Sequence, residues 1–160
     1  MFFFKQSNYD YSNSVTKVKM PVSQAASDLA KGLLNVLEYE ERKNLSEQLL
    51  DELCDLAGVD IVEFNLVDSN QIHRQRAGRI VMKRYGVYQV NSKTITIHHR
   101  TAGRGQIFAA KSYLDTLLHE WLHHYDFKKL KLNSIHSRGF YLRLNDLKAK
   151  LQIPIQKKSR

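Results

Sequence analysis

The sequence predicts an α+β fold in which a small antiparallel sheet packs against helices. Three patterns support this prediction. Leucines recur at helical spacing in residues 23–58, β-branched residues concentrate in residues 59–98, and helical spacing returns after residue 112. With 160 residues, of which 42% are hydrophobic and 26% charged, the chain suits one globular domain.

The first 58 residues divide into an arm and a helical part. Residues 1–21 are rich in Ser, Asn, Tyr and Lys, so we expect a loosely ordered N-terminal arm. Residues 22–58 predict two helices, separated by the charged residues 38–44. Ser23 can cap the first helix and Gly58 can end the second. The apolar positions that mark these helices are Leu29, Leu33, Leu34, Leu37, Leu45, Leu49, Leu50, Leu53 and Leu56.

Strands are predicted in the middle of the chain. Residues 61–67 are β-rich, and residues 79–90 fit one strand or a hairpin broken near Gly86. Residues 94–98 alternate, so that Ile95 and Ile97 share one face of a strand.

Two more helices are predicted in the C-terminal third. Ser112 to Asp115 match a capping box at the start of one helix. Ser137 opens the other, which Pro154 ends. We therefore expect a single domain over residues 22–160, with the sheet and these two helices in residues 59–153.

Charge is distributed unevenly along the chain, which has a net charge of +9. Residues 1–68 carry 6 Lys and Arg against 12 Asp and Glu, residues 69–127 carry 9 against 3, and residues 128–160 carry 10 against 1. A one-sided basic surface attracts polyanions, so we expect nucleic acid as a partner.

The composition also excludes several classes. The single cysteine, Cys54, permits neither an internal disulfide nor a cysteine-based zinc cluster, and we expect it to serve as core packing. No apolar run reaches the roughly 20 residues of a membrane span, and no signal peptide is recognisable, so no membrane partner is expected. The expected location is intracellular, in the cytoplasm or with nucleic acid in a nucleoid or nucleus.

The most informative segment is His119-Glu120-Trp121-Leu122-His123, an H-E-x-x-H sequence inside a predicted helix. Residues i and i+4 share a helix face, so both imidazoles can bind one metal ion, and we expect one Zn²⁺ per chain. Zinc lowers the pKa of a bound water toward about 7, and Glu120 is placed to act as its general base. Trp121 is expected in the core.

A catalytic zinc needs a third protein ligand from outside this motif. His136 is the preferred candidate, because it stands 13 residues after His123 and a short connection can fold it back onto the metal. His124 points about 100° away around the helix, so we expect it at the surface or behind the ligands. The other residues considered as ligands are His73, His98, His99, Asp126 and Asp146.

The motif His119-Glu120-x-x-His123, followed by His136-Ser137-Arg138-Gly139-Phe140, resembles the SprT-like zinc metallopeptidases, which include the Spartan DNA–protein crosslink proteases. The resemblance covers about residues 59–151 and implies a zincin-like fold. It implies zinc ligands His119, His123 and His136, Glu120 as general base, and hydrolysis of peptide bonds in a protein or peptide. In some members of this family peptide hydrolysis depends on DNA, and the resemblance extends that expectation to this chain. The chain departs from many members because one cysteine cannot form a zinc ribbon.

Without a ribbon, DNA contacts must come from the basic residues of the domain, which are Arg74, Arg76, Arg79, Arg100, Arg104, Lys128, Lys129 and Lys131. A peptide substrate is expected to pair with the strand near Ile95. Tyr88, Tyr125, Tyr141 and several arginines are candidate donors to a developing oxyanion, and the sequence does not choose among them.

Three other functions stay open. A three-histidine zinc ribonuclease would place its third histidine near Lys128, so the spacing disfavours that function. A peptidase with a carboxylate as third ligand would not need His136. The main alternative is a non-catalytic basic module that binds nucleic acid, with a structural zinc or no metal.

Overall fold

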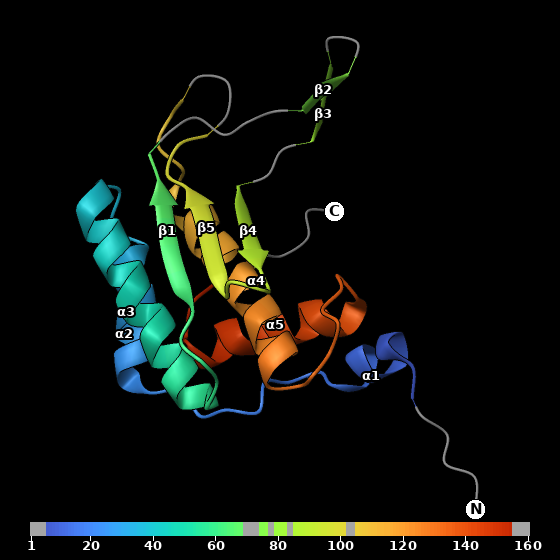
Figure 1. The fold of residues 1–160 in the computed structure, drawn as a ribbon. Coiled ribbons are helices and arrows are strands. Elements are labelled where there is room, and N and C mark those ends of the chain that lie inside the picture. Colours follow the sequence, from blue (N-terminus) through green and yellow to red (C-terminus); the bar gives the residue numbers. More distant parts are fainter. Residues whose placement is uncertain (1–5, 69–73, 77–78, 83–84, 102–104, 155–160) are drawn as a thin grey trace, which may run out of the picture.

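The computed structural model describes residues 6–68, 74–76, 79–82, 85–101 and 105–154. Its α+β class is the predicted one (Figure 1). Among these residues, no helix combines the length and hydrophobicity needed to cross a membrane. The elements in chain order are α1 (Asn8–Ser14), α2 (Gln24–Leu33), α3 (Tyr39–Ala57), β1 (Glu63–Val67), β2 (Arg74–Arg76), β3 (Arg79–Met82), β4 (Gly86–Gln89), β5 (Thr94–His98), α4 (Ala110–Lys128) and α5 (Arg138–Lys150).

The main sheet is mixed, which corrects the prediction of an antiparallel sheet. Its strand order is β1–β5–β4, and β2 pairs with β3 in a separate antiparallel pair. β1 runs parallel to β5, with Phe64 opposite Ile95, whereas β4 runs antiparallel to β5, with Tyr88 opposite Ile95. Alternation along a strand identifies its buried face but carries no information on the direction of its neighbour.

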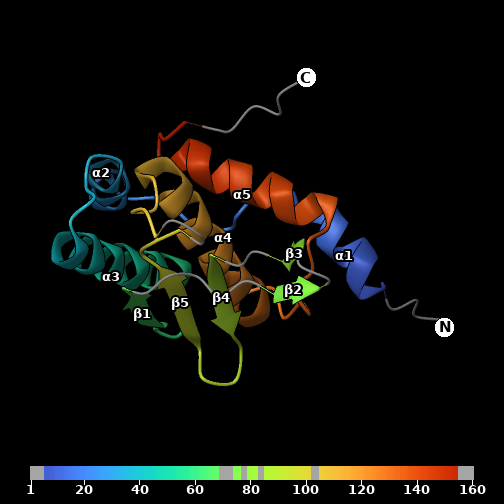
Figure 2. The ribbon, with the colours of Figure 1, turned by 90° about the horizontal axis from the view of Figure 1, so that it is seen from above.

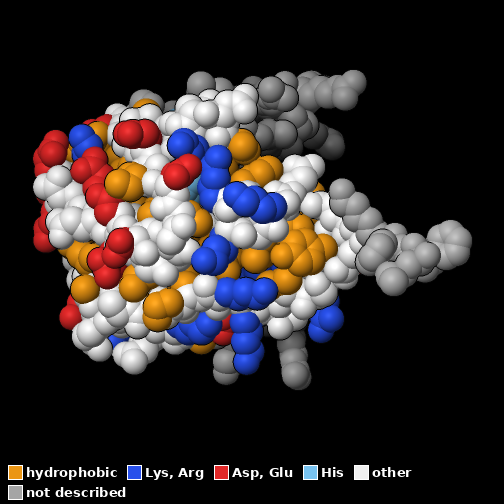
Figure 3. Space-filling model, turned by 60° about the horizontal axis from the view of Figure 1, so that its bottom comes forward, with side chains coloured by type: hydrophobic (Ala, Val, Ile, Leu, Met, Phe, Trp, Pro, Cys, Tyr) orange, Lys and Arg blue, Asp and Glu red, His pale blue; other side chains and the backbone are white. Residues whose placement is uncertain are grey.

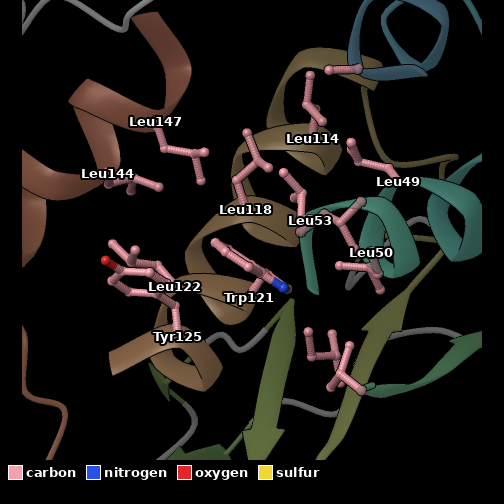
Figure 4. Close-up of a cluster of buried hydrophobic side chains, with 14 of the residues drawn as sticks. Leu49, Leu50, Leu53, Leu114, Leu118, Trp121, Leu122, Tyr125, Leu144 and Leu147 are labelled. Carbon is pink, nitrogen blue, oxygen red and sulfur yellow. The ribbon is translucent and has the colours of Figure 1, made fainter. Parts of the chain in front are cut away.

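Helix α4 occupies the centre of the molecule, between the sheet and α5 (Figure 2). Trp121 has no exposed surface, as predicted, and its indole N–H points to the Sγ of the buried Cys54 at 3.4 Å. Two sides of α4 are therefore held by apolar packing, which orients its remaining face (Figure 4). Leu114, Leu118 and Trp121 face Leu49, Leu50 and Leu53 of α3, while Leu122 and Tyr125 face Leu144 and Leu147 of α5.

Three helix ends follow the predicted signals. The Ser23 and Ser137 hydroxyls cap α2 and α5 by accepting N–H groups at 3.1 Å, and Gly58 ends α3 with φ 69°. Residues 38–44 do not interrupt the helices, because the Glu38 carboxylate caps α3 one residue before it begins. The predicted capping box at Ser112 is also wrong: α4 already begins at Ala110, without a side-chain cap.

Much of the described N-terminal segment packs against the domain, whereas the sequence predicted a loosely ordered arm over residues 1–21. Residues 8–20, here called the docked arm, comprise α1 and an extended piece that buries Val18 and Met20 in the core. The α1 helix is short and polar, so no hydrophobic periodicity marks it in the sequence. Residues 1–5 lie outside the described residues.

Candidate metal centre

Three imidazoles converge on one point. His119 and His123 lie one turn apart on α4, and His136 stands in the connection between α4 and α5. The Nε2 atom of His136 lies 3.0 Å from Nε2 of His119 and 3.0 Å from Nε2 of His123. Tetrahedral zinc, with Zn–N bonds of about 2.0–2.1 Å, holds its nitrogen ligands roughly 3.3 Å apart. Within the described residues, these histidines form a group whose geometry and donor atoms fit zinc.

The surroundings keep two of these imidazoles neutral. Burial, together with the neighbouring histidines, lowers the pKa of His119 to about 4 and that of His123 to about 3. Because a metal ligand must offer an unprotonated nitrogen, both rings are prepared to bind a cation at neutral pH. Phe140 stacks on the ring of His123 with a centroid separation of 4.6 Å, which restricts its rotation.

A hydrogen-bonded relay orients His123. The Ser134 hydroxyl donates to Oδ2 of Asp126 at 2.8 Å, and Nδ1 of His123 lies 2.8 Å from the same hydroxyl. Since that hydroxyl gives its proton to Asp126, it accepts the Nδ1–H of His123 and leaves Nε2 unprotonated. Arg143 pairs with Asp126 at 2.9 Å, and neither side chain has any exposed surface. Sequence reasoning missed this relay, because Ser134 carries no motif and Asp126 was considered only as a ligand.

Glu120 lies beside the three histidines in an open cleft of 1570 Å³ between β4, α4 and the segment 134–148. Gly86 on β4 makes this arrangement possible. A Cβ atom at Gly86 would lie 2.7 Å from Cγ2 of Thr116 and 3.2 Å from Cγ of Glu120. Any side chain there would push the strand and the helix apart, so the glycine keeps β4 against the Glu120 face of α4.

The strand beside the cleft is β4 and not the predicted strand near Ile95. Ile95 is fully buried on β5, which lies between β1 and β4. β4 stands at the end of the strand order, and Gly86, Val87 and Tyr88 line the cleft. A peptide adds to a sheet at an edge, so β4 replaces the strand of Ile95 as the place for such pairing.

His124 is fully buried, so of the two places expected for it, at the surface or behind the ligands, the structure excludes the surface. Its Nε2 lies 2.7 Å from the carbonyl oxygen of Asp60, and its Nδ1 lies 2.7 Å from the Tyr88 hydroxyl. A carbonyl only accepts, so Nε2 carries the proton and Nδ1 accepts the proton of Tyr88. His124 thus joins α4 to β4 and to the segment that precedes β1, on the opposite side from the three histidines.

The three candidate tyrosines have different environments. Tyr125 is fully buried, and its hydroxyl accepts the Lys19 N–H at 2.8 Å. Tyr88 lines the cleft, but its hydroxyl is bound to His124, and burial raises its pKa to about 12. Tyr141 is 46% exposed at the cleft, with ring centroids 6.3 Å from His119 and 6.1 Å from His136. Tyr141 is therefore the tyrosine placed to meet a bound molecule.

The remaining candidate ligands lie elsewhere. His99 is buried against the guanidinium of Arg42, with Nδ1 at 3.2 Å, and His98 stands half-buried on β5. Asp146 accepts the Val18 N–H at 2.9 Å and pairs with Lys150. His73 lies outside the described residues.

The predicted nucleic-acid residues whose side chains the structure describes do not form one surface. Lys128, Lys129 and Lys131 lie where α4 ends, while Arg100 follows β5 at the opposite end of α4 and pairs with Asp68 at 2.9 Å (Figure 1). Basic side chains do gather on one face, beside an acidic region (Figure 3). Arg104 lies outside the described residues, as do the side chains of Arg74, Arg76 and Arg79 on β2 and β3.

Comparison with known proteins finds no family model, no curated protein and no solved structure that matches the chain significantly.

Proposed function

We propose that the chain is a zinc-dependent metallopeptidase with a zincin-like active site of the SprT type. The observation that carries this proposal is the convergence of three Nε2 atoms beside Glu120 in an open cleft. A histidine that serves only packing has no reason to face two others at 3.0 Å, whereas a metal ligand does. The orienting relay behind His123 is the arrangement that ligating histidines require.

The proposed mechanism assigns a task to each side chain. His119, His123 and His136 would hold one Zn²⁺, which supplies Lewis acidity toward a carbonyl oxygen when bound. β4 offers its backbone groups to an extended protein or peptide substrate. Glu120 takes the proton of the attacking water and later gives it to the leaving amine. The Tyr141 hydroxyl donates a hydrogen bond to the oxyanion that develops on the substrate.

DNA is proposed as a second partner, because the face on which basic side chains gather can neutralise phosphates (Figure 3). The same face supports the alternative function, a non-catalytic nucleic-acid-binding module with a structural zinc or no metal. The two functions differ in what Glu120 does. A peptidase depends on its carboxylate, whereas a binding module does not.

The decisive experiment compares Glu120→Gln with wild type. We expect Glu120→Gln to keep its zinc and lose peptidase activity by about 10²–10⁴-fold, since it can no longer accept a proton. Glu63→Gln makes the same chemical change at an exposed position of β1 and should cleave normally. Cleavage of casein is measured with and without DNA, and zinc by mass spectrometry. The binding module would be supported by a different result. In that case the zinc-loaded wild type cleaves no casein, with or without DNA, and wild type and Glu120→Gln bind DNA equally well.

A further inference from the structure

The docked arm contacts the connection that carries the third histidine. Asn8 exchanges two hydrogen bonds with the backbone of Asn133, at 2.8 and 2.9 Å. Five residues along α1, Oδ1 of Asn13 accepts the N–H of Gly139 at 2.8 Å. That N–H belongs to the first turn of α5 and has no partner within its own helix. The arm therefore holds both ends of the segment that contains His136, and α1 lies beside the start of α5 (Figure 2).

This contact is close. The hydroxyls of Ser12 and Ser137 lie 2.7 Å apart and are buried. A Cβ atom built on Gly139 would lie only 2.0 Å from the carbonyl oxygen of Ser12, so only glycine permits the observed approach. Ser137 caps α5 and directly follows His136 in the chain. A shift of the arm would thus move the residue next to a candidate ligand.

A second path leads from the arm to His123. Nη1 of Arg143 donates to the carbonyl oxygens of Ser12 and Val15, at 2.5 and 2.7 Å. The same guanidinium donates through Nε and Nη2 to Asp126, at 3.1 and 2.9 Å, and Asp126 holds Ser134 in the relay to His123. Arg143 is fully buried, so undocking of the arm would remove two acceptors from the cation that also holds Asp126 and would open this pair to water.

We propose that the docked arm is a positioning element of the metal centre. Zinc affinity then depends on docking of residues 8–20, and bound zinc in turn stabilises the docked arm. The two effects must be equal, because coupling between two binding equilibria is reciprocal. A molecule that binds residues 8–20 in competition with the domain would therefore release zinc and inactivate the enzyme. The inference rests on the proposed function in taking zinc as the occupant of the site.

The test uses the full chain and the substitution Gly139→Ala, which wedges a methyl group against Ser12. Zinc dissociation constants are measured by competition with a chromophoric chelator. We expect Gly139→Ala to weaken zinc binding by about 10–100-fold, the usual range for residues that support ligands. Gly32→Ala is the matched control, since it also lies in a helix and its Cβ would meet Leu45 at an ordinary 3.7 Å. It should bind zinc as wild type does.

Hydrogen exchange supplies the reciprocal measurement. The amides of Val18 and Lys19 donate to Asp146 and to the Tyr125 hydroxyl, so they report docking of the arm. Zinc should slow their exchange in wild type, and Gly139→Ala should speed it. Equal exchange in Gly139→Ala and wild type would overturn the proposal, because the contact would then not hold the arm. Faster exchange with unchanged zinc affinity would overturn it as well.

Asn13→Ala guards against a folding failure of Gly139→Ala. It removes the acceptor of the Gly139 N–H without a clash, and it should weaken zinc binding in the same direction by a smaller factor. Faster exchange of the arm in Asn13→Ala with a wild-type zinc affinity would also contradict the proposal. A wild-type chain that binds no zinc would overturn the proposed function together with this inference. A wild-type chain in which zinc binding and docking of the arm are coupled, but which cleaves no peptide, would overturn the proposed function alone.

Discussion

Adjacent histidines on α4 have opposite surroundings. His123 faces the cleft, where its Nε2 lies 3.0 Å from Nε2 of His136. His124 faces the sheet, is fully buried and has both ring nitrogens bound, one to the Tyr88 hydroxyl and one to the Asp60 carbonyl. A ring with both nitrogens bound to protein groups is a structural cross-link. A ring with one nitrogen oriented by a protein hydroxyl, and the other facing further histidines, is placed to bind a metal.

The same contrast separates two tyrosines that line the cleft. The Tyr88 hydroxyl is already bound to His124, whereas Tyr141 stands exposed near His119. Residue type and proximity to the cleft therefore do not decide function on their own. The partners of the polar atoms decide it, and substitutions on the two sides of α4 should have separable effects.

The largest effect is expected from His136→Ala. Structural zinc sites bind with about 10–16 kcal/mol over four ligands, so one ligand accounts for roughly 3 kcal/mol, or about 10²–10³-fold in affinity. Peptidase activity should be lost with the metal. His98→Ala, on β5 and outside the histidine group, is the control and should retain zinc. Full zinc occupancy of His136→Ala under chelator competition would show that the third ligand lies elsewhere.

A smaller effect, on turnover only, is expected from Tyr141→Phe. Loss of one oxyanion donor should lower kcat by about 10²-fold and leave KM and zinc affinity nearly unchanged. Tyr88→Phe is the matched control on the other wall of the cleft, and its kcat should stay close to wild type because that hydroxyl is bound to His124. Equal kcat values for Tyr141→Phe and wild type would remove Tyr141 from the mechanism. Steady-state kinetics on a peptide substrate measure both variants.

The smallest effect is expected from His124→Phe, which should change stability and leave zinc binding intact. The substitution keeps a ring in the buried site but leaves the Tyr88 hydroxyl and the Asp60 carbonyl without their partner. A buried polar group without a partner costs about 1–3 kcal/mol, so the urea midpoint should fall accordingly. Zinc affinity should match wild type. A clear loss of zinc affinity in a folded His124→Phe would erase the proposed division between the two sides of α4.

Local signals predicted much of the fold and part of the site. Ser23, Gly58 and Ser137 act at helix ends as expected, and the i, i+4 spacing places His119 and His123 on one helix face. Other local signals were wrong where neighbouring residues favoured a different start of the helix. Ser112 does not cap α4, because Ala110 and Lys111 are good helix formers and the helix already begins at Ala110.

The sequence by itself determined the α+β class, the helix that carries the H-E-x-x-H motif and the choice of His136 as third candidate. These depend on residues within a few positions of one another, or on a motif that the order of residues displays directly. Only the tertiary structure decided the direction of β1 beside β5, the place of β4 along the cleft, the partners of His124 and the docking of residues 8–20. Ser12 meets Ser137 across 125 positions of the chain. Such contacts arise from packing and from the need to pair buried polar groups, and no local periodicity encodes them.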